Sequence, residues 1–203
     1  MKKKTIGRET IITAAILFAV LAAAVALDAA LPGYHIAIKV IKKGAVYALV
    51  AVSMNLLNGF TGLFSLGQAG FMLLGAYSYA VLCIPAAKRA GVYQYFDGGI
   101  VKFSLPEVFA GFLGDKAGAT VGMLAALIVG GLIAAFFAFL IGLPVLRLKS
   151  DYLAIATLGF AEILRTFIQW EALGPVTNAS NLLRGYSDIG GATAYLLLVG
   201  VFV

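Results

Sequence analysis

Long apolar blocks constrain the fold of this chain more than any other feature of its sequence. An α-helix needs about 20 mostly apolar residues to cross the hydrocarbon core of a bilayer, and several blocks approach or reach that length. The chain is 62% hydrophobic and only 12% charged, whereas soluble domains are about 45–50% apolar and about 25% charged. A soluble protein of this composition would lack the polar surface to cover itself. We therefore predict an all-α, polytopic membrane helix bundle that forms one transmembrane domain over 1–203.

Prolines, glycines and charges set the predicted limits of the blocks. All five prolines fall at block edges or in loops, where they do not interrupt a helix. The last block has only about twelve residues, which is too short for a span and suggests a fragment of a longer protein. A polar loop over 86–117 separates two spans, and within it 104–113 is expected to form a short interfacial helix capped by Ser104 and Glu107. The prediction is five spans and a partial sixth, at 11–31, 40–57, 63–84, 119–143, 152–170 and 192–203.

The positive charge indicates how the chain sits in a membrane. Most basic residues lie between apolar blocks, as expected for charge that flanks a membrane. The basic head ahead of the first block predicts a cytoplasmic N-terminus, although the count over all loops favours the opposite orientation. No basic stripe interleaved with aromatic residues is present, so we expect the lipid bilayer as a partner and no nucleic acid.

No pattern for catalysis, metal or cofactor binding is visible. The only histidine, His35, has no cysteine or histidine at ligand spacing, so no metal site is expected. Neither a P-loop nor a nucleophile elbow occurs. We therefore expect no catalytic residues, no cofactor and no enzymatic activity.

Polar and small residues interrupt the second and third blocks. The run Asn58-Gly59-Phe60-Thr61-Gly62 separates the blocks and predicts a broken helix pair near 58–62. A stripe at helical spacing follows, made of Ser65, Gln68, Gly75 and Tyr79. Two interpretations remain open for this stripe and the break. Small residues favour close helix packing, and a polar, glycine-broken helix pair is typical of a translocation path.

The fifth block carries two charges of opposite sign at helical spacing. Glu162 and Arg165 share one helix face and can form an ion pair, and Thr166 and Gln169 extend the same polar stripe. A charge at the membrane centre costs about 2.5–3.5 kcal/mol, and pairing reduces that cost. We predict a buried ion pair that locks helices together, with substrate contact and gating as alternatives. A separate pair, Gly118 and Gly122, predicts a close helix contact.

Two stretches of the chain together resemble one protein family. They are 55–79, with the broken helix pair and its stripe, and 146–165, which opens on a loop containing Arg147, Asp151 and Tyr152. Both are similar to the membrane permeases of bacterial high-affinity branched-chain amino acid ABC importers, on the LivM side of the LivH/LivM pair. The resemblance covers about 40–84 and 119–190.

The resemblance implies a function and a set of partners. A permease of this family sits in the bacterial plasma membrane and pairs with a homologous, LivH-like permease and two cytoplasmic ATPase subunits. An extracytoplasmic substrate-binding protein would deliver leucine, isoleucine or valine, which would cross by alternating access while the separate subunits hydrolyse ATP.

The sequence also departs from the family pattern. Family members are longer and carry their ATPase-docking loop late in the chain, and no such loop precedes Val203. The 86–117 loop is longer than expected, and we hypothesise that it helps to seat the binding protein. Other interpretations are a permease for another amino acid, an amide, a sugar or a nucleoside, a secondary transporter or channel, or a non-transporting membrane subunit.

Overall fold

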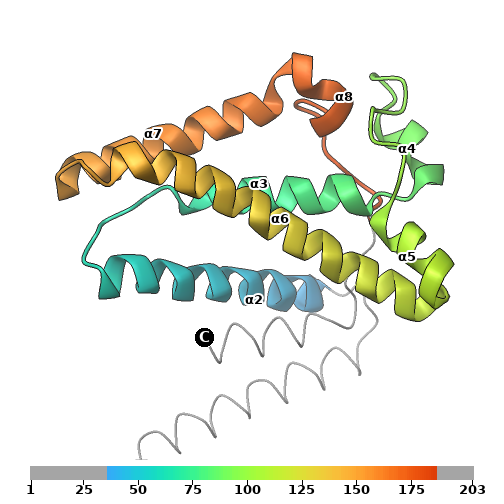
Figure 1. Ribbon diagram of the computed structural model, residues 1–203, viewed down its shortest axis with the longest axis horizontal. Coiled ribbons are helices and arrows are strands. Elements are labelled where there is room, and N and C mark those ends of the chain that lie inside the picture. Colours follow the sequence, from blue (N-terminus) through green and yellow to red (C-terminus); the bar gives the residue numbers. More distant parts are fainter. Residues whose placement is uncertain (1–35, 187–203) are drawn as a thin grey trace, which may run out of the picture. The chain divides into compact units, whose positions relative to one another are not determined.

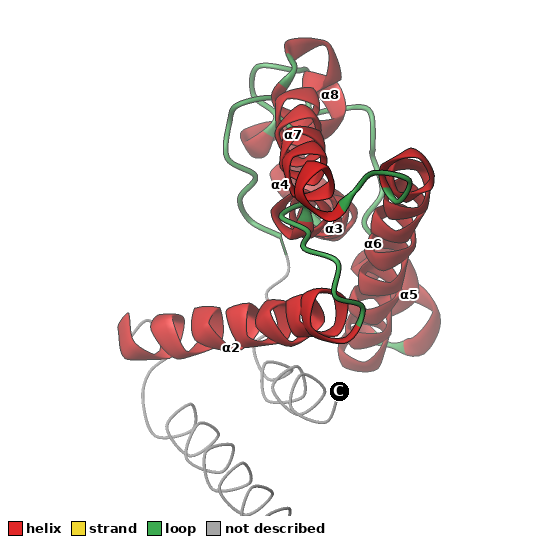
Figure 2. Cartoon of the chain, turned by 90° about the vertical axis from the view of Figure 1, so that its left-hand side faces the viewer, coloured by secondary structure: helices red, strands yellow, loops and turns green. Residues whose placement is uncertain are grey.

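The computed structural model describes residues 36–186, and these residues form helices joined by loops and turns (Figures 1 and 2). The predicted spans at 11–31 and 192–203 lie outside the described residues. The chain divides between Leu56 and Leu57 into two compact units. The first contributes α2 (Ile36–Asn55), and the second contains all the helices from α3 onward.

The described part is all-helical, as the composition predicts. The helices of the second unit are α3 (Gln68–Cys83), α4 (Ala86–Val92), α5 (Leu105–Leu113), α6 (Asp115–Val145), α7 (Ser150–Gln169) and α8 (Gly174–Thr177). A π-helix, Leu56–Phe60, follows α2, and a 3₁₀ turn, Glu171–Leu173, joins α7 to α8.

One described helix, α6, is long and apolar enough over Ala117–Val145 to cross a membrane by itself. A second candidate arises when α7 and the segment Glu171–Thr177 are taken as one span, although they bend by 58° at their junction. Helix α3 has 16 residues and is therefore about 24 Å long, which is shorter than a hydrocarbon core of about 30 Å. The described residues thus establish fewer complete spans than the sequence predicts for the same region.

Several helix limits differ from the predicted ones for local reasons. Helix α3 begins at Gln68 rather than near 63, because the chain is not helical over 61–67 and Gly62 has a φ of +67°. Helix α6 begins earlier than 119, at Asp115, and continues through Pro144 for one more residue. Proline is tolerated there because only the last turn of the helix loses its backbone hydrogen bond.

Helices α3, α6 and α7 pack side by side, with α6 running opposite to the other two (Figure 1). Leu74 of α3 forms a core cluster with Leu164 and Ile168 of α7. A Cβ atom added to Gly130 of α6 would lie 3.0 Å from the carbonyl oxygen of Gly75 in α3. Small residues therefore bring these backbones close together, as is common for membrane helices.

The segment 86–117 is a packed part of the fold rather than an open loop. Its helix α5 lies against the start of α6, where side chains on Gly118 or Gly122 would collide with the backbone of α5. The close helix contact predicted for this glycine pair is confirmed. Helix α5 forms as predicted, but the Ser104 hydroxyl does not cap it. The Glu107 carboxylate instead accepts a hydrogen bond from the Ala86 N–H at 3.1 Å.

Candidate functional site

The break between the π-helix and α3 is held by side-chain hydrogen bonds. The N–H of Ser65 donates to Asn58 Oδ1 at 3.2 Å, and the N–H of Gly67 donates to Ser65 Oγ at 3.4 Å. The N–H of Leu66 reaches α7, where it donates to Thr157 Oγ1 at 3.0 Å. Irregular backbone at membrane depth requires such partners, because no water is available there. The polar residues that interrupt the apolar blocks thus satisfy the broken backbone.

Two glycines also allow the chain after the break to pack closely against α7. A Cβ on Gly67 would lie 3.2 Å from Thr157 Cβ, and a Cβ on Gly70 would lie 2.8 Å from Ala161 Cα. Ser65, Gly67 and Gly70 are all buried. The two stretches that carry the family resemblance therefore meet in one closely packed joint, although they are far apart in the sequence.

The predicted stripe is divided among several neighbours. Ser65 precedes α3, so the helical part of the stripe begins at the half-buried Gln68. Gly75 faces Gly130 of α6, and the Tyr79 ring meets the Tyr186 ring edge to face with 6.5 Å between centroids. Ser65 and Gly75 are therefore in contact with neighbouring segments of the described chain. Gly59 and Gly62, at the break itself, are exposed.

The predicted ion pair forms on an exposed face of α7. Arg165 Nη1 lies 3.5 Å from Glu162 Oε1, and the two side chains are 60% and 67% exposed. The pair is therefore not buried within the described chain, contrary to the expectation from sequence. The Thr166 hydroxyl donates to the Glu162 carbonyl at 2.9 Å, and Gln169 is exposed as well. The polar stripe thus lies on the outside of the packed helices.

The residues of the predicted family-motif loop lie at the start of α7 and just ahead of it. Arg147 and Tyr152 are exposed. Asp151 lies in the first turn of α7, whose limits are Ser150–Gln169.

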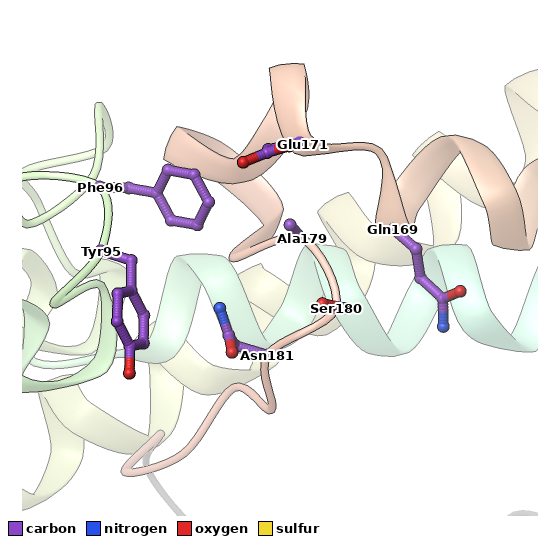
Figure 3. Close-up of a pocket in the computed structure, with 7 residues that line it drawn as sticks. All are labelled: Tyr95, Phe96, Gln169, Glu171, Ala179, Ser180 and Asn181. Carbon is purple, nitrogen blue, oxygen red and sulfur yellow. The ribbon is translucent and has the colours of Figure 1, made fainter.

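A pocket of about 630 Å³ lies at the C-terminal end of α7 (Figure 3). We call it the α7–α8 pocket. Figure 3 shows the Glu171 side chain pointing from the α7–α8 corner toward the side where Phe96 lies. Its volume falls in the range of small-molecule sites, about 300–1,000 Å³. Its lining consists of Tyr95, Phe96, Gln169, Glu171, Ala179, Ser180 and Asn181.

Hydrogen bonds between distant segments fix the two walls of this pocket. The Tyr93 hydroxyl donates to the Val176 carbonyl at 2.8 Å, and Asn178 Nδ2 donates to the Val92 carbonyl at 3.1 Å. The N–H of Ile100 donates to the Pro175 carbonyl at 2.9 Å. The two segments that border the pocket are therefore held together by hydrogen bonds of the fold.

The backbone around the pocket is also unusual. The Phe96 ring packs directly on Gly174, where any side chain would collide with it. Asn178 and Ala179 adopt positive φ values of 64° and 49°, which are uncommon for residues other than glycine. Such strained positions persist only where surrounding contacts hold them, and they often lie near functional sites.

Arg89 ties the same region to the end of α3. Its side chain is buried, and Nη2 donates to the carbonyls of Val81 at 2.8 Å and Phe103 at 2.7 Å. Burial lowers the pKa of Arg89, and the nearby Tyr93 and Glu107 oppose that shift. Burial raises the pKa of Tyr93, which Arg89 partly offsets. Arg89 Nε and Nη1 are buried without a hydrogen-bond partner.

Sequence reasoning anticipated only Gln169 among the residues of the pocket. Its other members lie in segments of mixed composition that carry no motif, and Arg89 resembles any loop arginine. Among the residues that the structure describes, no group of three or more histidine, cysteine, aspartate or glutamate side chains is placed to hold a metal ion.

Comparison with known proteins identifies the family. Residues 36–200 match the family model described as branched-chain amino acid transport system / permease component. The chain is 33% identical over 123 residues to the LivM permease protein of the high-affinity branched-chain amino acid transport system of Escherichia coli (strain K12). It is 32% identical over the same length to the LivM protein of Salmonella typhimurium.

These alignments cover 61% of this chain but only 21% of each relative. No solved structure matches the chain. The family model nevertheless covers both packed motif stretches and the α7–α8 pocket. The chain belongs to the family of branched-chain amino acid transport system permease components, and it is similar to LivM.

Proposed function

We propose that this chain is a permease subunit of an ATP-binding-cassette importer that moves branched-chain amino acids across a bacterial plasma membrane by alternating access. The family membership carries the proposal. The packed joint between 65–70 and α7 supports it, because the two motif stretches that resemble the family pack directly against each other.

The exposed faces of two helices support a partner within the membrane. On α6 the exposed large residues are apolar, including Leu124, Ile128 and Leu132, and such a face suits hydrocarbon. On α7 the exposed face carries Glu162 and Arg165, and charges at membrane depth face protein or water rather than lipid. The proposed occupant of the α7 face is the homologous permease subunit. Two ATPase subunits and a substrate-binding protein complete the proposed complex.

The packing also suggests how alternating access would work. Glycine contacts hold α3, α6 and α7 backbone to backbone, and close-packed interiors do not deform continuously. These three helices would therefore move as one body, and the path would open between two permeases rather than inside this one. With a cytoplasmic N-terminus, 86–117 and 171–186 would lie outside, where they would receive the binding protein.

Transport of labelled leucine by membrane vesicles tests the proposal. The vesicles contain this chain with its partner subunits, and the binding protein is supplied on the outer side. We expect uptake that requires both ATP and the binding protein. Uptake that continues without ATP and follows an ion gradient would show a secondary transporter instead.

A matched pair of variants connects this transport to the joint. Thr157→Val removes the oxygen that accepts the hydrogen bond from Leu66, while Ser53→Ala removes an exposed hydroxyl of α2 that donates to the Val50 carbonyl of its own helix. We expect the first variant to reduce uptake and the second to leave it near the wild-type value. If both variants change uptake equally, transport does not depend on the hydrogen bond between Leu66 and Thr157.

A further inference from the structure

We propose that the α7–α8 pocket binds the ammonium group of a small aliphatic amino acid, as a reception site at the mouth of the path. The inference rests on the proposed function and adds a site and a mode of recognition to it. Glu171 would face the ammonium group, and Tyr95 and Phe96 would contact the aliphatic side chain.

The chemistry of the lining points to this class of ligand. Glu171 is the only charged residue of the seven, and no lysine or arginine is among them. Glu171 forms no ion pair with any residue in the described part of the chain. A carboxylate attracts a cation and repels an anion. The pocket is therefore suited to an amine and not to an isolated carboxylate.

The other lining residues match the remainder of an amino acid. Gln169, Ser180 and Asn181 offer amide and hydroxyl groups, which can donate hydrogen bonds to a carboxylate without adding charge. Tyr95 and Phe96 provide apolar surface for a branched side chain. A few polar groups beside aromatic surface are the usual composition of a small-molecule site.

The walls of the pocket are set before any ligand arrives. Tyr93 and Asn178 link the two segments by partly buried hydrogen bonds, and Gly174 lets the Phe96 ring lie directly on the α8 backbone. A preformed site loses less entropy when a ligand binds. The pocket is open, however, so water and salt weaken its electrostatic attraction. Weak binding, suited to substrate that must leave again, is therefore expected.

Three ligands that share the isobutyl side chain of leucine test the recognition. The full chain in lipid nanodiscs is titrated at constant ionic strength with leucine, with 3-methylbutylamine, which lacks the carboxylate, and with 4-methylpentanoate, which lacks the amine. Saturation-transfer NMR of the ligands measures binding. Trp170, the only tryptophan of the chain, lies between the lining residues Gln169 and Glu171, and its fluorescence reports where binding occurs.

We expect saturable binding of leucine and the amine, with a change in Trp170 fluorescence, and much weaker binding of the carboxylate. Glu171→Gln should weaken both amine ligands about two- to fivefold, the range for one ion pair at an exposed position. Asp97→Asn is the control, because it removes an exposed negative charge outside the lining. Its positive φ of 50° is one that asparagine tolerates.

Three results would overturn the proposal. One is binding of 4-methylpentanoate as strong as that of leucine, and another is equal titration of Glu171→Gln and Asp97→Asn. An absence of saturable binding in both measurements would do the same. Leucine uptake by the assembled transporter is measured in parallel. If uptake is normal but Glu171→Gln and Asp97→Asn bind the ligands equally, the pocket is refuted as a binding site while the transport function stands. If the amine ligands bind but no uptake occurs, the transport function is refuted while the binding site stands.

Discussion

Replacing Gly70 by alanine tests how closely α3 packs against α7. The effect of this close packing on stability must be distinguished from the higher helix propensity of alanine compared with glycine. In the structure, a Cβ at Gly70 would lie 2.8 Å from Ala161 Cα, 3.1 Å from Ala161 Cβ and 3.3 Å from Leu164 Cδ1. The nearest of these atoms is backbone, which cannot move aside as a flexible side chain can. Gly75, on the same helix, is the matched control, because its nearest atom would be the Gly130 carbonyl oxygen at 4.0 Å.

The magnitude follows from two opposing effects. Alanine is favoured over glycine within a helix by about 0.8–1.0 kcal/mol, and this gain applies to both variants. Forcing an extra methyl group into a close-packed contact costs about 1–3 kcal/mol, and this cost applies only at Gly70. The free energy of unfolding of Gly70→Ala should therefore lie about 1–3 kcal/mol below that of Gly75→Ala.

The assay is denaturant unfolding of both variants in the same detergent, followed by helical circular dichroism. Comparing the two variants with each other cancels the helix preference and leaves the packing cost. A matching shift in the two midpoints, in the same direction and of similar size, would refute the close approach of α3 and α7 at Gly70. Leucine uptake measured on the same pair would show whether that contact also supports transport.

Three further predictions concern the region around the pocket and the face of α7. Arg89→Gln should lower the free energy of unfolding by about 2–4 kcal/mol, because two buried carbonyls lose a charged donor, while the exposed neighbour Lys88→Gln should change it by less than about 0.5 kcal/mol; denaturant unfolding measures both. Because burial raises the folded-state pKa of Tyr93 above the ordinary value of 10.0, its contribution to stability is complete below pH 10 and declines as the pH rises further. Unfolding across that pH range should therefore show a shallower alkaline loss for Tyr93→Phe than for wild type. Glu162→Gln should leave the stability of the chain within about 0.5 kcal/mol, as for other exposed pairs, yet reduce the amount of partner permease that copurifies; unchanged copurification would remove α7 from the proposed interface.

The helical class of the fold and the position of its break could be predicted from the sequence. Apolar blocks, prolines and the run Asn58-Gly59-Phe60-Thr61-Gly62 are local signals, and local signals suffice where the bilayer permits few backbone structures. The exact start of α3 was missed because it depends on Thr157, whose hydroxyl accepts the Leu66 N–H from another helix. No local pattern contains that information.

The Glu162–Arg165 pair shows the same limit in another form. Helical spacing correctly indicates that the two side chains can meet, and they lie 3.5 Å apart. Spacing does not indicate which way a helix face turns, because orientation depends on what the neighbouring helices cover. Gly70 of α3 packs against a neighbouring side of α7, at Ala161 and Leu164, and the charged side is left exposed.

The α7–α8 pocket is the feature that the sequence predicts least. Phe96 and Glu171 are far apart along the chain and belong to no motif, and their meeting requires the Tyr93 and Asn178 hydrogen bonds. Gly174 does not by itself predict a contact with Phe96, because a glycine ahead of a proline is also common in ordinary turns. Gly70 and Gly75 look equivalent in the sequence, because both are single glycines within the same apolar helix. Only the positions of Ala161 and Gly130 distinguish a contact that tolerates no side chain from one that does.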